Sequence, residues 1–219
     1  MVKDRGLIIY GINRQAQQLY YYLTREGYNV EAFCVDKDFY KEAALLGRPV
    51  VFFEDIVSLY PPNKYDIILS FGYKNMVKNR KEKYILCHDR GYRTPTYISA
   101  DAKVYTNTIG DGVIIFPNVV IEPFVEIGNG CFFESSCTIA HHSIIGEFCF
   151  FAPGVTTGGG IIVGDYCFFG VASIIASDKN IAPRTLVGAG VSVTKDTIEG
   201  IGLRHSEPVR LSKDPEYYI

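Results

Sequence analysis

An apolar residue returns at every sixth position through the second half of the chain, and this spacing constrains the fold more than any other feature. The series runs from Ile109 to Val193 and is broken only at Thr157. The residue after each apolar position is mostly glycine or alanine, and the residue four places on is mostly small. A short period sustained over so many units indicates a solenoid, in which each unit stacks on its neighbours.

The length of the repeat indicates which solenoid to expect. It resembles the hexapeptide-repeat, left-handed parallel β-helix, in which three six-residue units make one triangular coil. Residues eighteen apart should then stack, with β-branched residues inside and small residues at the corners. An outward apolar file needs a cover, and a neighbouring subunit is the expected one. The predicted inner file is Phe133, Phe151 and Phe169, and the outward file is Phe132, Phe150 and Phe168.

The cysteines fit the same register. The chain has six and no CxxC pair, so free thiols are expected rather than a disulfide framework. Cys131, Cys137, Cys149 and Cys167 fall on small inward positions, where a thiol acts as a small hydrophobe. None of these four is expected to be catalytic.

The first part of the chain alternates strand-like and helix-like segments. Apolar runs predict strands over 6–10, 30–35 and 66–71, and helical spacing predicts helices over 13–26 and 74–90. This β-α-β order predicts a small parallel sheet. The expected fold class is therefore an α/β Rossmann-like domain over residues 1–98, followed by an all-β left-handed β-helix with a C-terminal tail over 99–219.

Ligands of such sheets bind beyond the carboxyl ends of the strands. Here those ends are Gly11 to Asn13, Asp36 with Lys37, and Gly72. Only Gly11 of the dinucleotide glycine fingerprint is present, so a mononucleotide or nucleotide-sugar fits better than a dinucleotide. Ordinary turn residues are the alternative interpretation.

Bulk properties exclude several classes of partner. Charged residues make up 21% of the chain and the net charge is −2, which gives no sign of nucleic-acid binding. No apolar run is long enough for a membrane span, and the N-terminal run is too short for a signal peptide. The simplest expectation is a cytoplasmic protein.

His141 and His142 stand side by side in a chain with only four histidines. They fall between two inward positions, so at least one imidazole should point outward. Gly159 lies eighteen residues after His141 and leaves room there for a thin ligand arm. A general base and a solvated pair are both open interpretations. A metal site is not expected, because the other two histidines, His88 and His205, lie outside the repeat.

Both halves together resemble the bacterial sugar acyltransferases grouped with the sialic-acid O-acetyltransferases and the bacillosamine-pathway nucleotide-sugar N-acetyltransferase. The resemblance covers nearly the whole chain. It implies that acetyl-CoA donates an acetyl group to an amino or hydroxyl group of a sugar. It also implies homotrimers with active sites between subunits, and an N-terminal domain that holds the nucleotide.

The resemblance assigns roles to residues of the β-helix. His141, followed by Ile145 and Gly146, matches the catalytic base, and His142 replaces the acidic residue that orients that base. The matching CoA-lining positions are Gly159, Val171 and Ala189. Phe150 stands where relatives carry a second histidine near the thioester.

The resemblance also assigns the acceptor site to the N-terminal domain. Relatives carry a Gly-His pair in the first turn, where this chain has Gly11, Asn13 and Arg14; the position of Arg14 suits a pyrophosphate. Asp36, next to Lys37, matches an acid that helps to hold the nucleotide base, and Gly72 matches a glycine after the third strand.

These features predict an acetyl-CoA-dependent N-acetyltransferase that acts on a nucleotide-linked amino sugar in bacterial surface-glycan (O-antigen) biosynthesis, with no metal. Two alternatives stay open. One is a sugar O-acetyltransferase, and the other is a β-helix that has lost catalysis and serves as a binding or assembly subunit.

Overall fold

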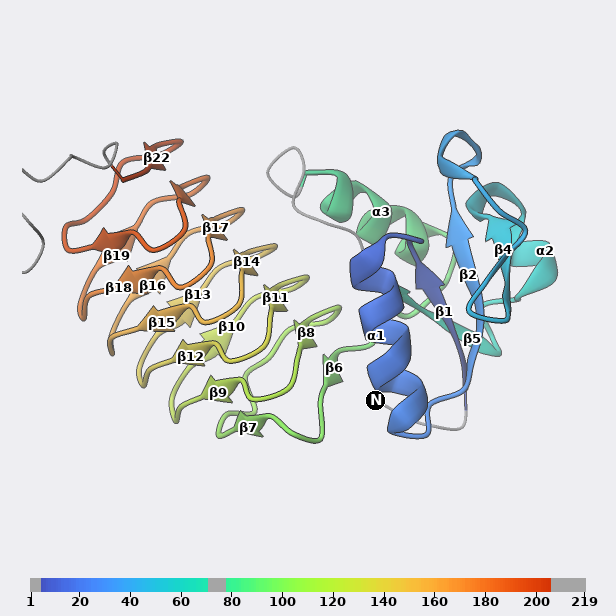
Figure 1. Cartoon of the computed structure of the whole chain (residues 1–219), viewed down its shortest axis with the longest axis horizontal. Helices are drawn as coiled ribbons and strands as arrows, with labels where there is room; N and C mark the ends of the chain where they lie inside the picture. Colours follow the sequence, from blue (N-terminus) through green and yellow to red (C-terminus); the bar gives the residue numbers. More distant parts are fainter. Residues whose placement is uncertain (1–4, 71–77, 206–219) are drawn as a thin grey trace, which may run out of the picture.

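The computed structural model describes residues 5–70 and 78–205, and it places an α/β domain beside the first coils of a β-helix (Figure 1). Helix α1 (Arg14–Arg25) lies between the N-terminal sheet and the β-helix. No helix of the described residues is long and apolar enough to cross a membrane. The expected fold class is confirmed in both parts.

The N-terminal sheet has five strands in the order β3-β4-β2-β1-β5. The four strands from β4 to β5 pair in parallel, and β3 adds an antiparallel edge. Helix α1 starts at the N-cap Asn13, whose side chain accepts a hydrogen bond from the Ala16 amide at 2.9 Å. The strands are β1 (Gly6–Tyr10), β2 (Val30–Val35), β3 (Ala44–Leu45), β4 (Arg48–Phe52) and β5 (Tyr65–Leu69).

The sequence located most of these elements. β1 and β2 match the predicted strands, β5 begins one residue earlier than predicted, and α3 (Lys78–Asp89) lies within the predicted helix. The elements between β2 and β5 were missed. β4 is as long as β1, but it begins with Arg48 and Pro49 and so shows no continuous apolar run, and the others are too short to show a period. Besides β3 and β4 they are η1 (Lys37–Phe39), η2 (Phe53–Asp55) and α2 (Ile56–Leu59).

The β-helix consists of two-residue strands in three parallel sheets, one for each side of the triangular coil. Partners are eighteen residues apart, as predicted, for example Phe132 with Phe150 and Phe150 with Phe168. The first sheet holds β6 (Tyr97–Ile98), β8 (Ile114–Ile115), β11 (Phe132–Phe133), β14 (Phe150–Phe151), β17 (Phe168–Phe169), β20 (Leu186–Val187) and β22 (Gly202–Leu203). The second holds β7 (Lys103–Val104), β9 (Val120–Ile121), β12 (Thr138–Ile139), β15 (Thr156–Thr157), β18 (Ile174–Ile175) and β21 (Ser192–Val193). The third holds β10 (Glu126–Ile127), β13 (Ile144–Ile145), β16 (Ile162–Val163) and β19 (Asn180–Ile181).

Each corner of the coil contains one residue in the left-handed backbone region. Every sixth residue from Gly112 to Gly190 has a positive φ, and several of them are not glycine. His142 is one of these residues, with φ of 57°. Such conformations are sparsely populated for residues with a Cβ and persist where the surrounding structure imposes them. The corner geometry therefore fixes the direction in which His142 leaves the coil.

The interior of the β-helix follows the predicted files. The rings of Phe133, Phe151 and Phe169 stack at centroid distances of 4.7 and 4.6 Å. The four repeat cysteines are free and buried, and the Cys131 thiol donates to the Gly146 carbonyl at 3.0 Å. Their structural role is thus confirmed.

The outward aromatic file is covered by the chain's own N-terminal domain, so the expectation of a subunit cover was wrong for its first members. Phe132 is 1% exposed and Phe150 is 4% exposed, and both belong to one core with Ala16, Leu19 and Leu23 of α1. The period places these rings outside the coil but cannot show which surface then docks on them. Phe168 is only partly buried and stacks on Phe150 at 5.5 Å.

Candidate active site

His141 and His142 lie at the corner that follows the second sheet. The His141 amide donates to Glu122 Oε2 at 2.9 Å, and the His141 carbonyl accepts from the Gly160 amide at 2.9 Å. Both imidazoles are exposed. The ring of His142 also packs against that of Phe124, one coil earlier, with the ring centres 4.8 Å apart and the planes tilted by 37°. The backbone is therefore fixed while both rings face outward, as predicted for at least one of them.

The two imidazoles are hydrogen-bonded to each other, with 3.0 Å between their Nδ1 atoms. One Nδ1 must carry the proton and the other must offer a lone pair. When His141 donates, its Nε2 is left unprotonated and can accept a proton. His142 thereby offers His141 the acceptor that a carboxylate would offer, but without a fixed negative charge.

Gly159 lies directly beside the His141 ring. A Cβ built on Gly159 would stand 2.5 Å from His141 Cε1 and 2.9 Å from both ring nitrogens. Only a glycine leaves the imidazole its present position. The amides of Gly158 and Gly160 are used in pairing between coils, so within this run of glycines the Gly159 amide is the one left out of that pairing.

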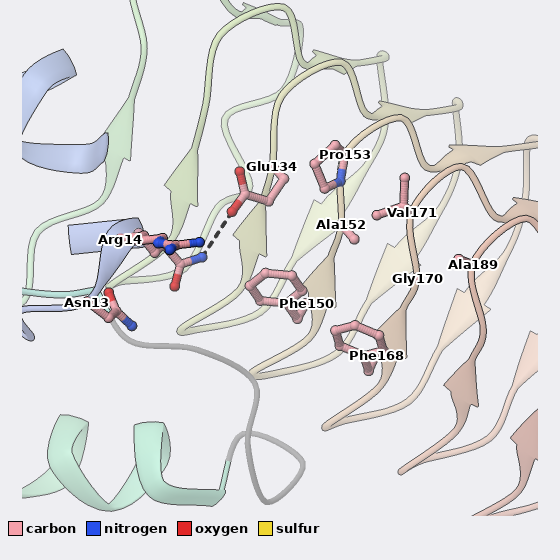
Figure 2. Close-up of a pocket in the computed structure, with 11 residues that line it drawn as sticks. Asn13, Arg14, Glu134, Phe150, Ala152, Pro153, Phe168, Gly170, Val171 and Ala189 are labelled. Atoms are coloured by element: carbon pink, nitrogen blue, oxygen red, sulfur yellow. Dashed lines mark hydrogen bonds between the residues drawn. The ribbon is translucent and has the colours of Figure 1, made fainter. Parts of the chain in front are cut away.

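A pocket of about 610 Å³ lies at a different corner, the one that follows the first sheet. Asn13 and Arg14 lie at one end, Val171 and Ala189 lie at the other, and Phe150 and Phe168 lie between them (Figure 2). The structure thus brings the expected acceptor residues Asn13 and Arg14 together with Phe150, Val171 and Ala189. Gly159, which was also expected to line CoA, does not line this pocket. The size is within the usual range for a small-molecule site.

Two polar side chains line the same pocket where α1 meets the β-helix. Gln15 Nε2 donates to Glu134 Oε1 at 3.0 Å, and Glu134 is 8% exposed. Burial raises the pKa of Glu134, and hydrogen bonds from Gln15 and from the backbone of Ser135 oppose the rise. Gln15 Oε1 is buried and has no hydrogen-bond partner among the described residues.

Two further residues expected at the nucleotide site, Asp36 and Lys37, do not line this pocket. Asp36 Oδ1 accepts a hydrogen bond from Tyr10 Oη at 2.6 Å and forms an ion pair with Lys83 Nζ at 2.6 Å. Burial and this hydrogen bond raise the pKa of Tyr10 far above its ordinary value, so its hydroxyl stays a donor. Lys37 Nζ lies 5.4 Å from the centre of the Phe52 ring.

The last two residues expected at the nucleotide site are Gly11 and Gly72. Gly11 follows β1 with φ of 125°, and its amide donates to the Cys34 carbonyl at 2.9 Å. It therefore serves the turn between β1 and α1. Gly72 lies outside the described residues.

The sequence missed Gln15, Glu134, Pro153, Phe168 and Gly170 as pocket residues. One signal was available for Glu134. The residue after each apolar repeat position is mostly glycine or alanine, and a glutamate there is an exception. The contact of Glu134 with Gln15 spans 119 residues and arises only when the two domains dock.

The described residues hold no group of three or more His, Cys, Asp or Glu side chains that could bind a metal ion. The histidine corner and the pocket use different corners of the same coil, so a single chain does not bring His141 to the pocket.

Comparisons with known proteins place the fold. Residues 108–141 match the family model "Bacterial transferase hexapeptide (six repeats)". No curated protein sequence matches the chain. The acetyltransferase domain of PglB from Neisseria gonorrhoeae has a TM-score of 0.80 and 19% identity, over 90% of this chain and 95% of that one. That domain has also been solved with acetyl coenzyme A.

Two further structures have the same architecture. GDP-perosamine N-acetyl transferase from Caulobacter crescentus, a mutant solved with CoA and GDP-perosamine, has a TM-score of 0.81 and 24% identity, over 90% of this chain and 92% of that one. WeeI from Acinetobacter baumannii has a TM-score of 0.68 and 20% identity, over 90% of this chain and 94% of that one. Over both of its domains, the chain therefore has the fold of these bacterial proteins, two of which are acetyltransferases, and its β-helix carries the repeat of the bacterial hexapeptide transferases.

Proposed function

We propose that the chain is an acetyl-CoA-dependent N-acetyltransferase that acts on a nucleotide-linked amino sugar in surface-glycan biosynthesis. The pocket of about 610 Å³ carries this proposal, because it joins the start of α1 to the corners of the β-helix. Arg14 suits phosphate oxygens at one end, and the apolar end at Val171 and Ala189 suits the thin arm of CoA. The Caulobacter enzyme, which has the same fold, was solved with CoA and GDP-perosamine.

His141 is the proposed base. The sugar amine attacks the thioester carbonyl, the new C–N bond forms, and the C–S bond breaks. The amine proton passes to Nε2 of His141, and CoA leaves as its thiol after protonation. The Nδ1 contact with His142 keeps Nε2 free for this task when His141 is the donor. The Gly159 amide is the nearest candidate donor to the oxyanion.

The active unit is a homotrimer in this proposal. The histidine corner and the pocket are separate corners of one coil, and cyclic symmetry brings different surfaces of neighbouring copies together. His141 of one copy then serves the pocket of the next. We place the reaction in the cytoplasm, where acetyl-CoA and nucleotide-sugars are made.

The test is an acetyl-transfer assay with acetyl-CoA and a panel of UDP-, dTDP- and GDP-linked amino sugars. The expected result is release of the CoA thiol with one amino sugar and gain of one acetyl group in its mass. His141→Ala should lower the rate by about a hundredfold or more. Transfer only to sugars that lack the amine, at a hydroxyl group, would show that the enzyme is an O-acetyltransferase and would contradict the proposed N-acetylation. Absence of both CoA binding and transfer would favour a non-catalytic binding or assembly role.

A further inference from the structure

The pocket contains two acceptor groups that lack enough donors. Gln15 Oε1 is buried without a partner among the described residues. Glu134 receives one side-chain hydrogen bond, from Gln15, and one backbone hydrogen bond, from Ser135, although an ionised carboxylate can accept about four. A buried polar atom without a partner is costly, so a native fold that keeps one calls for an explanation.

The other pocket residues that the structure describes supply no further donor to these two groups. Arg14 and Asn13 line the pocket, but neither side chain bonds to Glu134 or to Gln15 Oε1 in the described residues. The neighbouring lining is apolar, with Phe150, Ala152 and Phe168 (Figure 2). The missing donors therefore come from outside the described residues of one chain, and water, a neighbouring copy or a ligand can supply them.

We infer that Glu134 and Gln15 form the subsite for the amino group of the acceptor sugar, and that this pair makes the enzyme select an amine over a hydroxyl. The inference rests on the proposed function and names the two residues that recognise the amino group of the acceptor. The sequence alone predicts no functional role for Glu134, which lies in the repeat, or for Gln15, which lies just after the first turn.

The number of donors explains the selection. A neutral amine has two N–H donors and an ammonium has three, so it can satisfy the Glu134 carboxylate and Gln15 Oε1 together. A hydroxyl has one O–H donor and leaves one of the two acceptors unsatisfied. An ammonium also brings the positive charge that a buried carboxylate lacks here, because Glu134 has no ion pair among the described residues.

The experiment measures equilibrium binding by titration calorimetry without acetyl-CoA. The probes are the panel of nucleotide-linked amino sugars and, for the member that binds, the nucleotide-sugar with a hydroxyl in place of the amine. The wild-type protein should prefer the amine by about 10- to 100-fold, since a hydrogen bond to a charged group is involved. Glu134→Gln keeps the shape but removes the charge, and it should reduce this preference to about threefold or less.

Gln15→Met removes the second acceptor and should also reduce the preference. Glu54→Gln is the matched control, because Glu54 is exposed on the N-terminal domain and does not line the pocket. It should bind like the wild type. The melting temperature of each variant checks that the fold is intact.

The outcomes separate the two proposals. Equal wild-type affinity for amine and hydroxyl, or a preference that survives in Glu134→Gln, would overturn the subsite and leave acetyl transfer standing. No binding of any nucleotide-sugar would overturn the acceptor class and the subsite together.

Discussion

A single methyl group at Gly159 should disable the site without unfolding the protein. The Cβ of Gly159→Ala would stand 2.5 Å from His141 Cε1, whereas carbon atoms in contact lie about 3.5–4.0 Å apart. The imidazole must then retreat by about 1 Å or more. A displacement of that size can cost about a hundredfold in rate.

Stability should hardly change in this variant. The obstacle is an exposed side chain that can move, and Gly159 does not use the left-handed region. Replacing glycine by alanine at a compatible position is neutral or stabilising by about 0.4–1 kcal/mol. Gly128→Ala is a useful contrast, because its Cβ would lie 2.8 Å from the Gly146 backbone, which cannot move aside as a side chain can. This variant should therefore have a lower melting temperature than the wild type.

The assay is kcat/KM for acetyl transfer in a double-mutant cycle with His141→Ala. If Gly159→Ala acts by displacing His141, adding it to His141→Ala should cost less than about threefold more. Multiplicative losses would mean that Gly159 acts elsewhere, for instance on CoA. A wild-type rate in Gly159→Ala would refute the role given to the His141 position.

Three further predictions concern the interface, the histidine pair and the buried carboxyl. Phe132→Ala should lower the free energy of unfolding by about 3–5 kcal/mol in urea titrations, because Phe132 is 1% exposed between the domains; a loss below about 1 kcal/mol would contradict that packing. His142→Ala should lower kcat about threefold to tenfold, because the Nδ1 acceptor is lost, whereas His142→Glu should restore an acceptor; equal losses in both would exclude this role. Burial raises the pKa of Glu134, so its contribution to stability is complete below about pH 4 and is lost as pH rises through the raised pKa. The melting temperature of Glu134→Gln minus that of wild type should therefore grow from about pH 4 upward, and a constant difference would argue against the raised pKa.

The β-helix could be predicted because its period repeats many times. Each apolar position from Ile109 onward carries the same information, so the register and the inner aromatic file follow from counting. The strands β1 and β2 were equally clear as apolar runs that end at turn residues. The short elements between β2 and β5 have no comparable repetition.

The surface and the pocket could not be predicted in the same way. A period shows that Phe132 and Phe150 point outward, but the domain that covers them is chosen by tertiary packing. The left-handed backbone of His142 had only a weak signal: His142 falls on the same six-residue register as Gly130, Gly154 and Gly160, and histidine is enriched at positive φ. Gln15 meets Glu134 only through the docking of α1 on the β-helix.

An active site shared between two copies is tested most directly by complementation. His141→Ala keeps the pocket, and Val171→Glu blocks the pocket at an exposed position while it keeps His141. The two variants, each inactive alone, would be co-expressed with different tags and purified as mixed oligomers. Each mixed trimer has one interface in three that joins an intact His141 to an intact pocket, so the purified mixed trimers should show about a third of the wild-type acetyl transfer. Mixed oligomers with no more activity than either variant alone would contradict the shared site.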